Sequence, residues 1–393
     1  MDAIRTAVIG IGNMGSAHAK GIASGLIQGL TLSAVCDLKP ERLAWAAREL
    51  PGVQGYSDYK ALLAAGAADA VIIAVPHPLH SRIARDAMNA GLHVLSEKPL
   101  DIRVSEARRA VETARSTGRI FAVMLNQRTD PIFRRAREIV QGGGLGELKR
   151  SVWIITNWYR TQHYYDSGEW RASWLGEGGG VLLNQAPHNL DLWQWICGMP
   201  VEMTAYCDLA RYHHIEVEDE ATLLVRYANG ATGCFITSTG EYPGTNRLEI
   251  SGTRGKIVLE EGKLRFWHLK EDETNVRFSS LSDSPNLPLE YSEWTPDTPA
   301  AAHAGILRNF ADAMLHGAPL ISPAGDGLNE LTLSNAAYLS AWEGNVPVSL
   351  PLDEKRFDEL LAERQKTSVL RGGHGKAENE KAGEYSSRWQ VKW

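Results

Sequence analysis

The chain has 393 residues, which is too long for one ordinary hydrophobic core and favours two domains. Hydrophobic residues make up 44% and charged residues 22%, as in ordinary globular proteins, and the formal net charge is −6. This balance argues against nucleic acid or an anionic membrane as a partner and leaves a small-molecule ligand open.

The four cysteines are scattered and form no Cys-x-x-Cys pair. The sequence therefore predicts neither a disulfide framework nor a cysteine-based metal site. The first residues run directly into a strand pattern without the charged and apolar regions of a signal peptide. No apolar run reaches the roughly 18 residues that a membrane helix needs. We expect a cytoplasmic protein that does not contact membranes.

The first part of the chain alternates short apolar runs with helical patterns. Helical spacing is found at 41–50, 81–91 and 105–118. This alternation predicts a doubly wound, parallel Rossmann sheet that occupies residues 1–125. The runs that are typical of buried parallel strands are 6–10, 32–37, 69–76, 93–97 and 120–125.

A Gly-x-Gly-x-x-Gly loop follows the first of these strands. Its glycines let backbone N–H groups approach a pyrophosphate at the N-terminus of the next helix. Asp37, at the end of the second strand, can accept hydrogen bonds from a ribose and would repel a 2′-phosphate. These features predict NAD rather than NADP, although Lys39 and Arg42 lie close enough in sequence to help bind a phosphate. The loop residues expected at the cofactor are Gly10, Gly12, Asn13, Met14 and Gly15.

The pattern changes near residue 145, where longer alternating segments begin. Asn229-Gly230 indicates a hairpin turn between two of them. The segments predict a large, mostly antiparallel open sheet in a second, α+β domain over residues 126–350, used for substrate binding and oligomerisation. Residues 351–393 are expected to form a C-terminal helix and a tail of low order. The segments are 148–159, 201–210, 221–239 and 246–260, and helical patterns return at 302–317, 326–344 and 353–365.

Lys98 stands in Glu97-Lys98-Pro99, directly after the strand at 93–97. Ligands of doubly wound sheets bind at the carboxyl ends of the strands, so Lys98 is placed where a nicotinamide and a substrate would meet. A lysine there can have a lowered pKa and exchange a proton with a substrate hydroxyl. The alternative is a surface lysine at a strand end.

Residues 176–191 read GEGGGVLLNQAPHNLD. The spacing of Asn184, His188 and Asp191 would place all three side chains on one face of a helix. Pro187 cannot donate a hydrogen bond to residue 183, so we also expect a kink or a helix restart that turns Asn184 relative to His188. His188 could alternatively be a buried structural histidine, and Asp191 could simply form a cap or a local pair.

The glycine loop, Glu97-Lys98-Pro99, and the later pattern Gly179-Gly180-x-Leu182 followed by His188-x-x-Asp191 resemble the glucose-fructose oxidoreductase, inositol dehydrogenase and rhizopine catabolism family over roughly residues 4–350. The resemblance implies hydride transfer between a nicotinamide cofactor and a secondary alcohol of a sugar or cyclitol. It also implies a homo-oligomer, a dimer or tetramer formed through the second sheet.

The same resemblance implies catalytic roles for Lys98 as the acid/base group and for His188 as a second one, or as the group that holds the reacting hydroxyl. Asn184 stands where the family usually has aspartate. Asparagine cannot take a proton, so a two-carboxylate relay is ruled out at that position and Asn184 is expected to orient a neighbour. Asp191 is expected near the substrate.

The resemblance places further side chains beside the cofactor. His77 and His80 could be read as a metal pair, but interleaved prolines and the lack of other ligands argue against this, and we expect no metal. Arg128 could equally form an ion pair that links the domains. The residues expected at the cofactor are Pro76, His77, His80, Glu97, Lys98, Asn126 and Arg128.

An aromatic and basic loop precedes the glycine cluster. Loops of this composition are costly unless they pack or bind something. Their rings can stack on sugar faces, while an arginine could instead meet an anionic group on the sugar. A subunit interface is the alternative. The residues expected at the substrate are Trp158, Tyr159, Arg160, His163, Trp170, Arg171 and Trp174.

Our leading hypothesis is an NAD(H)-dependent oxidoreductase that acts on a ring hydroxyl carbon, with C3 favoured, of a pyranose, pyranoside or cyclitol. A second hypothesis is a redox-neutral, NAD-dependent glycosidase that works by transient C3 oxidation, elimination, water addition and re-reduction. A third is a non-catalytic NAD-binding sensor.

Overall fold

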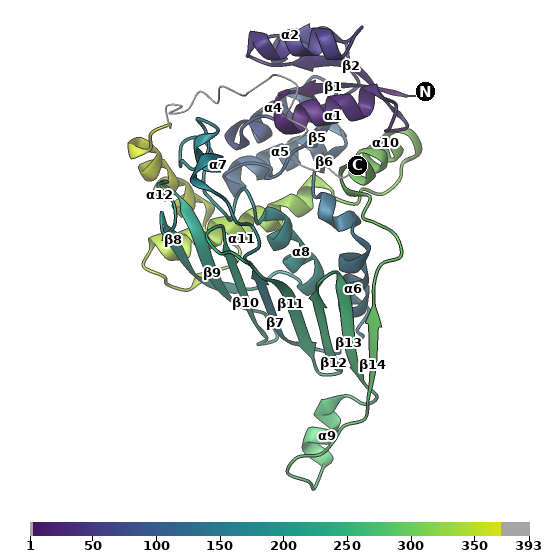
Figure 1. Cartoon of the computed structure of the whole chain (residues 1–393), viewed down its shortest axis with the longest axis vertical. Helices are drawn as coiled ribbons and strands as arrows, with labels where there is room; N and C mark the ends of the chain where they lie inside the picture. Colours follow the sequence, from purple (N-terminus) through teal and green to yellow (C-terminus); the bar gives the residue numbers. More distant parts are fainter. Residues whose placement is uncertain (1–2, 371–393) are drawn as a thin grey trace.

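The computed structural model describes residues 3–370. The chain forms two sheets, one above the other in Figure 1, with helices between and around them. The tail expected at the C-terminal end lies outside the described residues from position 371 onward. The helix expected before it is confirmed as α12 (Glu354–Thr367), which packs on α5 and α11.

The first sheet is parallel and has the strand order β3-β2-β1-β4-β5-β6. It confirms the predicted doubly wound fold. Strand β3 was not predicted, because its three residues, Gln-Gly-Tyr, have no buried apolar run. The strands are β1 (Ile4–Ile9), β2 (Leu30–Cys36), β3 (Gln54–Tyr56), β4 (Ala70–Ile73), β5 (His93–Ser96) and β6 (Phe121–Val123). The helices that follow them are α1 (Asn13–Ala23), α2 (Pro40–Glu49), α3 (Tyr59–Ala64), α4 (His80–Asn89) and α5 (Val104–Thr117).

The second sheet has the order β14-β13-β12-β11-β7-β10-β9-β8-β15 and is antiparallel except where β7 pairs with β10. It confirms the predicted open sheet. Strand β14 was missed because its side chains are mostly exposed on both faces, which removes the alternating pattern. The strands are β7 (Leu148–Ile155), β8 (Glu202–Leu209), β9 (Glu218–Arg226), β10 (Thr232–Ser238), β11 (Asn246–Gly252), β12 (Gly255–Glu260), β13 (Lys263–Leu269), β14 (Leu289–Trp294) and β15 (Val348–Ser349).

Helices α6, α8 and α11 pack against this second sheet. Helix α10 instead returns to the first sheet, where Ile306 and Phe310 join the core around Ile4 and Val8. The stretch from 302 to 316 therefore packs with the nucleotide-binding layer, although its position in the sequence lies within the second predicted domain. The remaining elements are η1 (His77–Leu79), η2 (Asn126–Thr129), α6 (Pro131–Gln141), α7 (Gln162–Asp166), α8 (Pro187–Cys197), α9 (Glu273–Ser279), α10 (Ala302–His316) and α11 (Ala324–Trp342).

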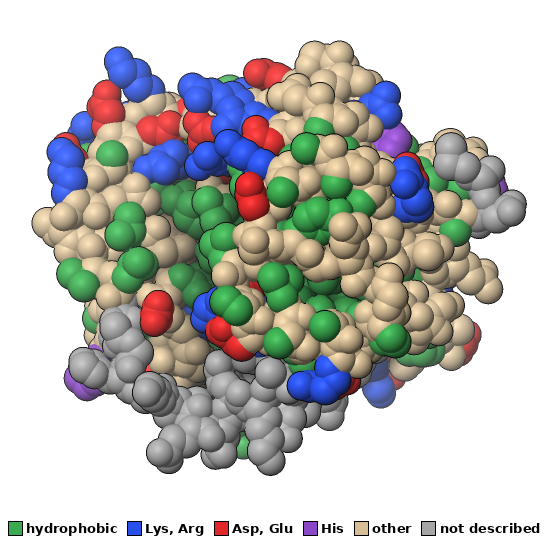
Figure 2. Space-filling model, turned by 90° about the horizontal axis from the view of Figure 1, so that it is seen from above, with side chains coloured by type: hydrophobic (Ala, Val, Ile, Leu, Met, Phe, Trp, Pro, Cys, Tyr) green, Lys and Arg blue, Asp and Glu red, His purple; other side chains and the backbone are tan. Residues whose placement is uncertain are grey.

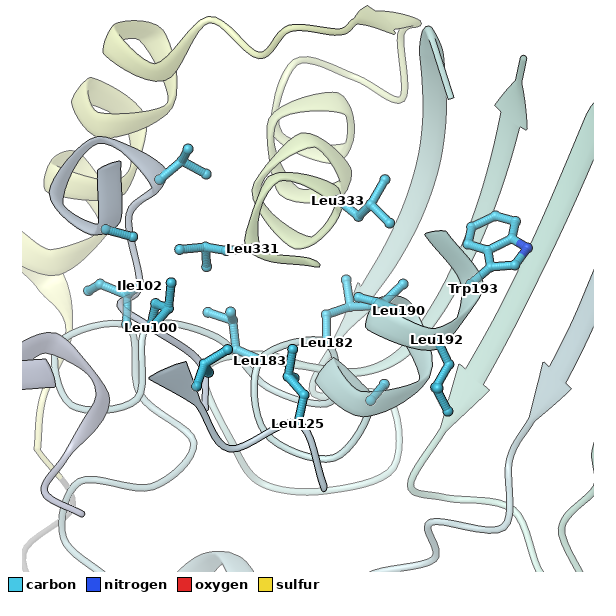
Figure 3. Packing of buried hydrophobic residues seen from close by; sticks show 14 of the residues in the cluster. Leu100, Ile102, Leu125, Leu182, Leu183, Leu190, Leu192, Trp193, Leu331 and Leu333 are labelled. Atoms are coloured by element: carbon cyan, nitrogen blue, oxygen red, sulfur yellow. The ribbon is translucent and has the colours of Figure 1, made fainter. Parts of the chain in front are cut away.

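A continuous hydrophobic core joins the two layers, as Figure 3 shows. Leu100 and Leu125 reach it from the ends of the first sheet, and Leu182, Leu190 and Leu331 reach it from the glycine-rich segment, α8 and α11. All five are at most 1% exposed, and each such side chain contributes roughly 1.5–3 kcal/mol by burial. The core therefore holds the glycine-rich segment firmly against the end of β5.

On the face shown in Figure 2, basic and acidic side chains lie side by side. Within residues 3–370, no helix is long and apolar enough to cross a membrane.

Candidate active site at the ends of the parallel strands

The glycine loop between β1 and α1 is shaped for close approach of a ligand. Gly10 has φ +86°, and a Cβ there would lie 2.5 Å from the carbonyl oxygen of Ala74. A Cβ on Gly12 would meet nothing within 4 Å, so this side of the loop is open. Asn13 Oδ1 is buried without a hydrogen-bond partner among the described residues. An open backbone at a helix N-terminus fits a pyrophosphate, whereas the Asn13 oxygen, a hydrogen-bond acceptor, fits a donor such as a ribose hydroxyl.

Asp37 holds the same loop from the end of β2. Its Oδ2 accepts a hydrogen bond from Ile11 N at 2.9 Å, and its Oδ1 accepts one from Lys39 N at 2.9 Å. Each carboxylate oxygen keeps a second lone pair with which it can accept a ribose hydroxyl. This arrangement agrees with the predicted preference for NAD, since the carboxylate would repel a 2′-phosphate.

His77 and His80 follow β4, and their ring nitrogens contact backbone carbonyl oxygens. His80 Nδ1 lies 2.6 Å from Pro99 O and its Nε2 lies 2.7 Å from Val75 O, while His77 Nδ1 lies 3.1 Å from Glu177 O. No group of three or more His, Cys, Asp or Glu residues within 3–370 could hold a metal ion. The two rings thus connect the loop that contains Pro76 to the lysine loop and to the glycine-rich segment.

Lys98 lies between the two layers. Its Nζ donates a hydrogen bond to the backbone oxygen of Asn184 at 2.7 Å, and its peptide bond to Pro99 is cis. Burial lowers the pKa of the Lys98 ammonium, although the carboxyl groups of Glu97 and Glu177 oppose this shift. The lysine is therefore suited to exchange a proton with a neighbouring hydroxyl.

Glu97 and Asn126 flank the lysine on the cofactor side. Glu97 Oε1 lies 2.7 Å from His18 Nε2; burial would raise the pKa of Glu97, but His18 and nearby positive charges lower it to about 2. Asn126 Nδ2 lies 3.3 Å from Nδ1 of His303 on α10, and Asn126 Oδ1 is buried without a partner in the described part of the chain. That oxygen fits the carboxamide N–H of a nicotinamide.

His188 stands in the first turn of α8, which begins at Pro187. The expected helix restart is confirmed, and the expectation that Asn184 shares a helix face with His188 is wrong because Asn184 precedes the helix. Burial, with help from the charge of Lys98, lowers the pKa of His188 to about 3. His188 Nδ1 is buried and unpartnered in the described region. A neutral ring with an open nitrogen is better suited to hold a hydroxyl than to donate a proton to it.

Glu177 is a site residue that the sequence reasoning missed. It is 1% exposed, and its carboxylate accepts hydrogen bonds from Ala172 N at 2.6 Å and from Nδ2 of Asn184. Burial raises the pKa of Glu177, and the Arg171 guanidinium at 3.9 Å counteracts this. The structure thus supplies a carboxyl group beside Asn184, from seven positions earlier in the chain. The sequence does offer one indication of this role, because Glu177 is the only acidic residue within the glycine cluster.

Arg128 and Asp191 form a buried ion pair, each with a side chain that is 1% exposed. Arg128 Nη2 and Nε donate to the two oxygens of Asp191 at 2.6 and 2.8 Å, and Arg128 Nη1 donates to Asp326 at 2.6 Å. The pair joins η2 to α8. The pair connects segments 63 positions apart, so for Asp191 it is not a local pair, and contact of either residue with cofactor or substrate stays a prediction.

The aromatic loop separates into parts with different surroundings. The ring centroids of Trp170 and His77 are 5.3 Å apart. The Arg171 guanidinium lies 4.7 Å from the centroid of the Trp170 ring. Trp174 is 5% exposed and packs on Tyr338 and Trp342, so it belongs to the core instead of lining a surface that a sugar could reach.

The outer part of this loop lies towards the second sheet. Trp158 Nε1 donates to Asn189 Oδ1 at 3.2 Å, next to His188, and the Arg160 guanidinium lies 5.7 Å from the Trp158 ring. Tyr159 and His163 are exposed. Of the residues expected at the substrate, Trp158, Arg160, Trp170 and Arg171 therefore lie beside site residues.

Known proteins share both halves of this architecture. A scyllo-inositol 2-dehydrogenase (NAD(+)) from Bacillus subtilis is 27% identical over 90% of this chain and 97% of that protein. A levoglucosan dehydrogenase from Pseudarthrobacter phenanthrenivorans is 26% identical over 71% of this chain and 77% of that protein. The crystal structure of the WlbA dehydrogenase from Bordetella pertussis, in complex with NADH and UDP-GlcNAcA, matches with a TM-score of 0.74 and 28% identity over 89% of this chain and 100% of that one.

Family assignments cover both sheets. Residues 4–125 match an oxidoreductase family described as an NAD-binding Rossmann fold. Residues 133–258 match the GFO/IDH/MocA C-terminal domain. The chain therefore belongs to the glucose-fructose oxidoreductase, inositol dehydrogenase and rhizopine catabolism (GFO/IDH/MocA) family of oxidoreductases, and its first domain has that family's NAD-binding Rossmann fold.

Proposed function

We propose that this protein is an NAD(H)-dependent dehydrogenase that transfers hydride to or from a ring hydroxyl carbon, with C3 favoured, of a pyranose, pyranoside or cyclitol. The observation that carries the proposal is the position of Lys98. Its amine lies at the end of β5 and is hydrogen-bonded to Asn184 of the glycine-rich segment. The names of similar proteins, which act on inositol and levoglucosan, support this substrate class.

The nicotinamide supplies the hydride acceptor or donor when it is bound. Lys98 accepts the hydroxyl proton during oxidation and returns it during reduction. The lowered pKa of Lys98 makes the neutral amine available at lower pH than in a free lysine. His188 holds the hydroxyl as a neutral hydrogen-bonding group, because its pKa of about 3 keeps it uncharged near neutral pH.

The chain's own residues also limit how far the lysine can move. Lys98 Nζ is held by Asn184 O, and the Asn184 side chain is held by Glu177 and by the hydroxyl of Tyr164 at 3.2 Å. Glu177 is in turn fixed by the backbone of Ala172. We assign Asn184 and Glu177 positioning roles, since both act on the reaction through Lys98.

A redox-neutral glycosidase remains the second candidate, and Glu177 favours it. Transient oxidation at C3 followed by elimination needs one group for the hydroxyl proton and another for the proton at C2 or the leaving group. Lys98 can serve the first purpose. Glu177, whose buried carboxyl has a raised pKa, is close enough to Asn184 to be considered for the second.

One assay separates the candidates. The protein is mixed with NAD and a panel of inositols, pyranoses and nitrophenyl pyranosides, and NADH absorbance and nitrophenol release are followed together. A dehydrogenase forms NADH in proportion to the sugar consumed, whereas a glycosidase releases nitrophenol without accumulating NADH. Tight NAD binding without either signal would overturn both proposals and support a sensor.

We also propose that the protein forms a cytoplasmic homo-oligomer, a dimer or tetramer, through the face of the second sheet that α6, α8 and α11 leave uncovered. Tyr206 and Leu224 are 51% and 46% exposed on that face, and the four cysteines are free. Sedimentation equilibrium tests the assembly: a monomer at micromolar concentration would contradict it.

A further inference from the structure

A cavity of about 320 Å³ opens beside the site, where five structural elements end or begin. Strand β7 ends there at Ile155, opposite Asn246, where β11 begins, and β12 ends at Glu260. Gln127 of η2 and Asn189 of α8 close it from the other side. Its volume lies at the lower end of the range for small-molecule sites.

The cavity adjoins the reacting groups through neighbouring residues of the chain. Gln127 follows Asn126, which faces the cofactor side, and Asn189 follows His188. Trp158 lines the cavity and donates its indole N–H to Asn189 at 3.2 Å. A substrate whose first ring lies between Lys98 and His188 can therefore extend a substituent towards this space.

The lining combines apolar and amide groups. Phe133, Trp153 and Leu248 provide an apolar floor, and Gln127, Asn157 and Asn189 provide hydrogen-bonding amides. Sugars present the same combination, with C–H faces that pack on aromatic rings and hydroxyls that bond to amides.

The charge of the lining narrows the choice of ligand. Asp130, Glu260 and Glu261 contribute carboxyl groups, and no lysine, arginine or histidine is among the described residues that line the cavity. Arg247 and Arg265 pair with Glu260 from outside the lining. Arg265 also lies 4.0 Å from Glu261. A phosphate or carboxylate entering this space would therefore find no cationic side chain in the lining that could bind it.

We infer that this cavity is a subsite for a second, uncharged sugar ring joined to the ring that reacts at Lys98, so that the preferred substrate is a neutral disaccharide or oligosaccharide. The inference rests on the proposed function, because it takes the reacting ring to lie between Lys98 and His188. It separates this chain's substrates from nucleotide-linked sugars, whose diphosphate would find no cationic side chain in the cavity to bind it.

The test is a calorimetric titration of the full chain saturated with NADH, so that no oxidation occurs. The ligands are methyl glucosides and methyl galactosides, the neutral disaccharides maltose, cellobiose, lactose and melibiose, and UDP-glucose and UDP-galactose. We expect at least one disaccharide to bind about tenfold tighter than its matched methyl glycoside, and neither UDP-sugar to gain affinity. Equal affinities, no binding of any disaccharide, or tighter binding of a UDP-sugar would overturn the inference.

Two variants test whether the gain in disaccharide affinity arises in this cavity. Asn157→Trp fills the exposed rim of the cavity and should reduce the ratio of disaccharide to monosaccharide affinity about tenfold. Asn286→Trp, which makes the same change at an exposed position between α9 and β14, should leave that ratio unchanged. If both variants, or neither, changed the ratio, the subsite would not be this cavity. NADH formation from a monosaccharide by the unmodified protein reports separately on the proposed function.

Discussion

The two sides of the candidate active site hold their functional groups by different means. On the first side, the cofactor loop, the Pro76 loop and Lys98 follow β1, β4 and β5, so a regular parallel sheet places them. On the other side, residues 176–186 have no regular helix or strand of their own. Buried carboxyl groups organise that segment instead.

Glu218 shows how this second kind of support works. Its two oxygens accept hydrogen bonds from Gly180 N and Leu182 N, both at 2.9 Å, and from the Tyr338 hydroxyl at 2.7 Å. Burial nevertheless raises the pKa of Glu218 to about 7, so desolvation outweighs these bonds. Strand ends thus position residues without buried charged partners. An irregular segment needs buried polar partners, whose desolvation is unfavourable in free energy.

The largest expected effect is on the first side, at Lys98. Lys98→Met should reduce kcat/KM for sugar oxidation by about 10²–10⁴-fold, because the proton acceptor is lost. In the unmodified protein, oxidation should become faster as pH rises through the lowered pKa of Lys98, since the neutral amine is the base. Initial rates across pH, with NAD saturating, check both points. Full activity in the variant would remove Lys98 from the mechanism.

The next effect tests whether α8 is held by its buried ion pair. Arg128→Met leaves Asp191 buried without its cation and should lower the free energy of unfolding by about 3–5 kcal/mol. Arg108→Met is the matched control, because the Arg108–Glu354 pair is partly exposed to solvent and is worth about 0–1 kcal/mol. Urea denaturation measures both, and similar losses would show that the buried pair has no special role.

A smaller loss of rate is expected when the glycine-rich segment loses the carboxyl group of Glu177. Glu177→Gln should lower kcat by about tenfold to a hundredfold and alter its pH profile, since Asn184 and, through it, Lys98 lose a fixed partner. Glu106→Gln is the control, because Glu106 pairs with Arg109 and Arg85, neither of which is a proposed site residue. An unchanged kcat and pH profile would make Glu177 purely structural.

The smallest effect concerns cofactor choice. Asp37→Ser keeps a short polar side chain but removes the charge, and it should weaken NADH binding and strengthen NADPH binding, each by about tenfold. Fluorescence titration with the two dinucleotides measures the ratio. If the ratio stayed constant, the carboxylate would serve only to hold Ile11 and Lys39.

The first side could be predicted well because its information is local. The glycine motif, Asp37 and Lys98 each follow a buried apolar strand, and strand order then places them at one edge. The helix start at Pro187 was also predictable, because proline is favoured in the first turn and excluded from the interior.

The second side was harder to predict because its contacts are distant in sequence. Arg128 bonds to Asp191 over 63 positions, and Glu218 bonds to Gly180 over 38. No periodic pattern marks such partners, so Arg128 and Asp191 were assigned to ligands and Glu177 was overlooked. Trp174 shows the same difficulty, since a tryptophan in a polar loop looks similar whether it binds a sugar or enters the core.

Transfer of deuterium from the sugar to the cofactor tests most directly whether this protein moves a hydride. The protein is incubated with NAD and a sugar that carries deuterium on the reacting ring carbon, and the nicotinamide is analysed by mass spectrometry after rapid quenching. Hydride transfer predicts deuterium at C4 of the reduced nicotinamide, accumulating in a dehydrogenase and present only in the bound fraction in a redox-neutral glycosidase. Product formation without any deuterium in the cofactor would contradict hydride transfer and the roles assigned to Lys98 and His188.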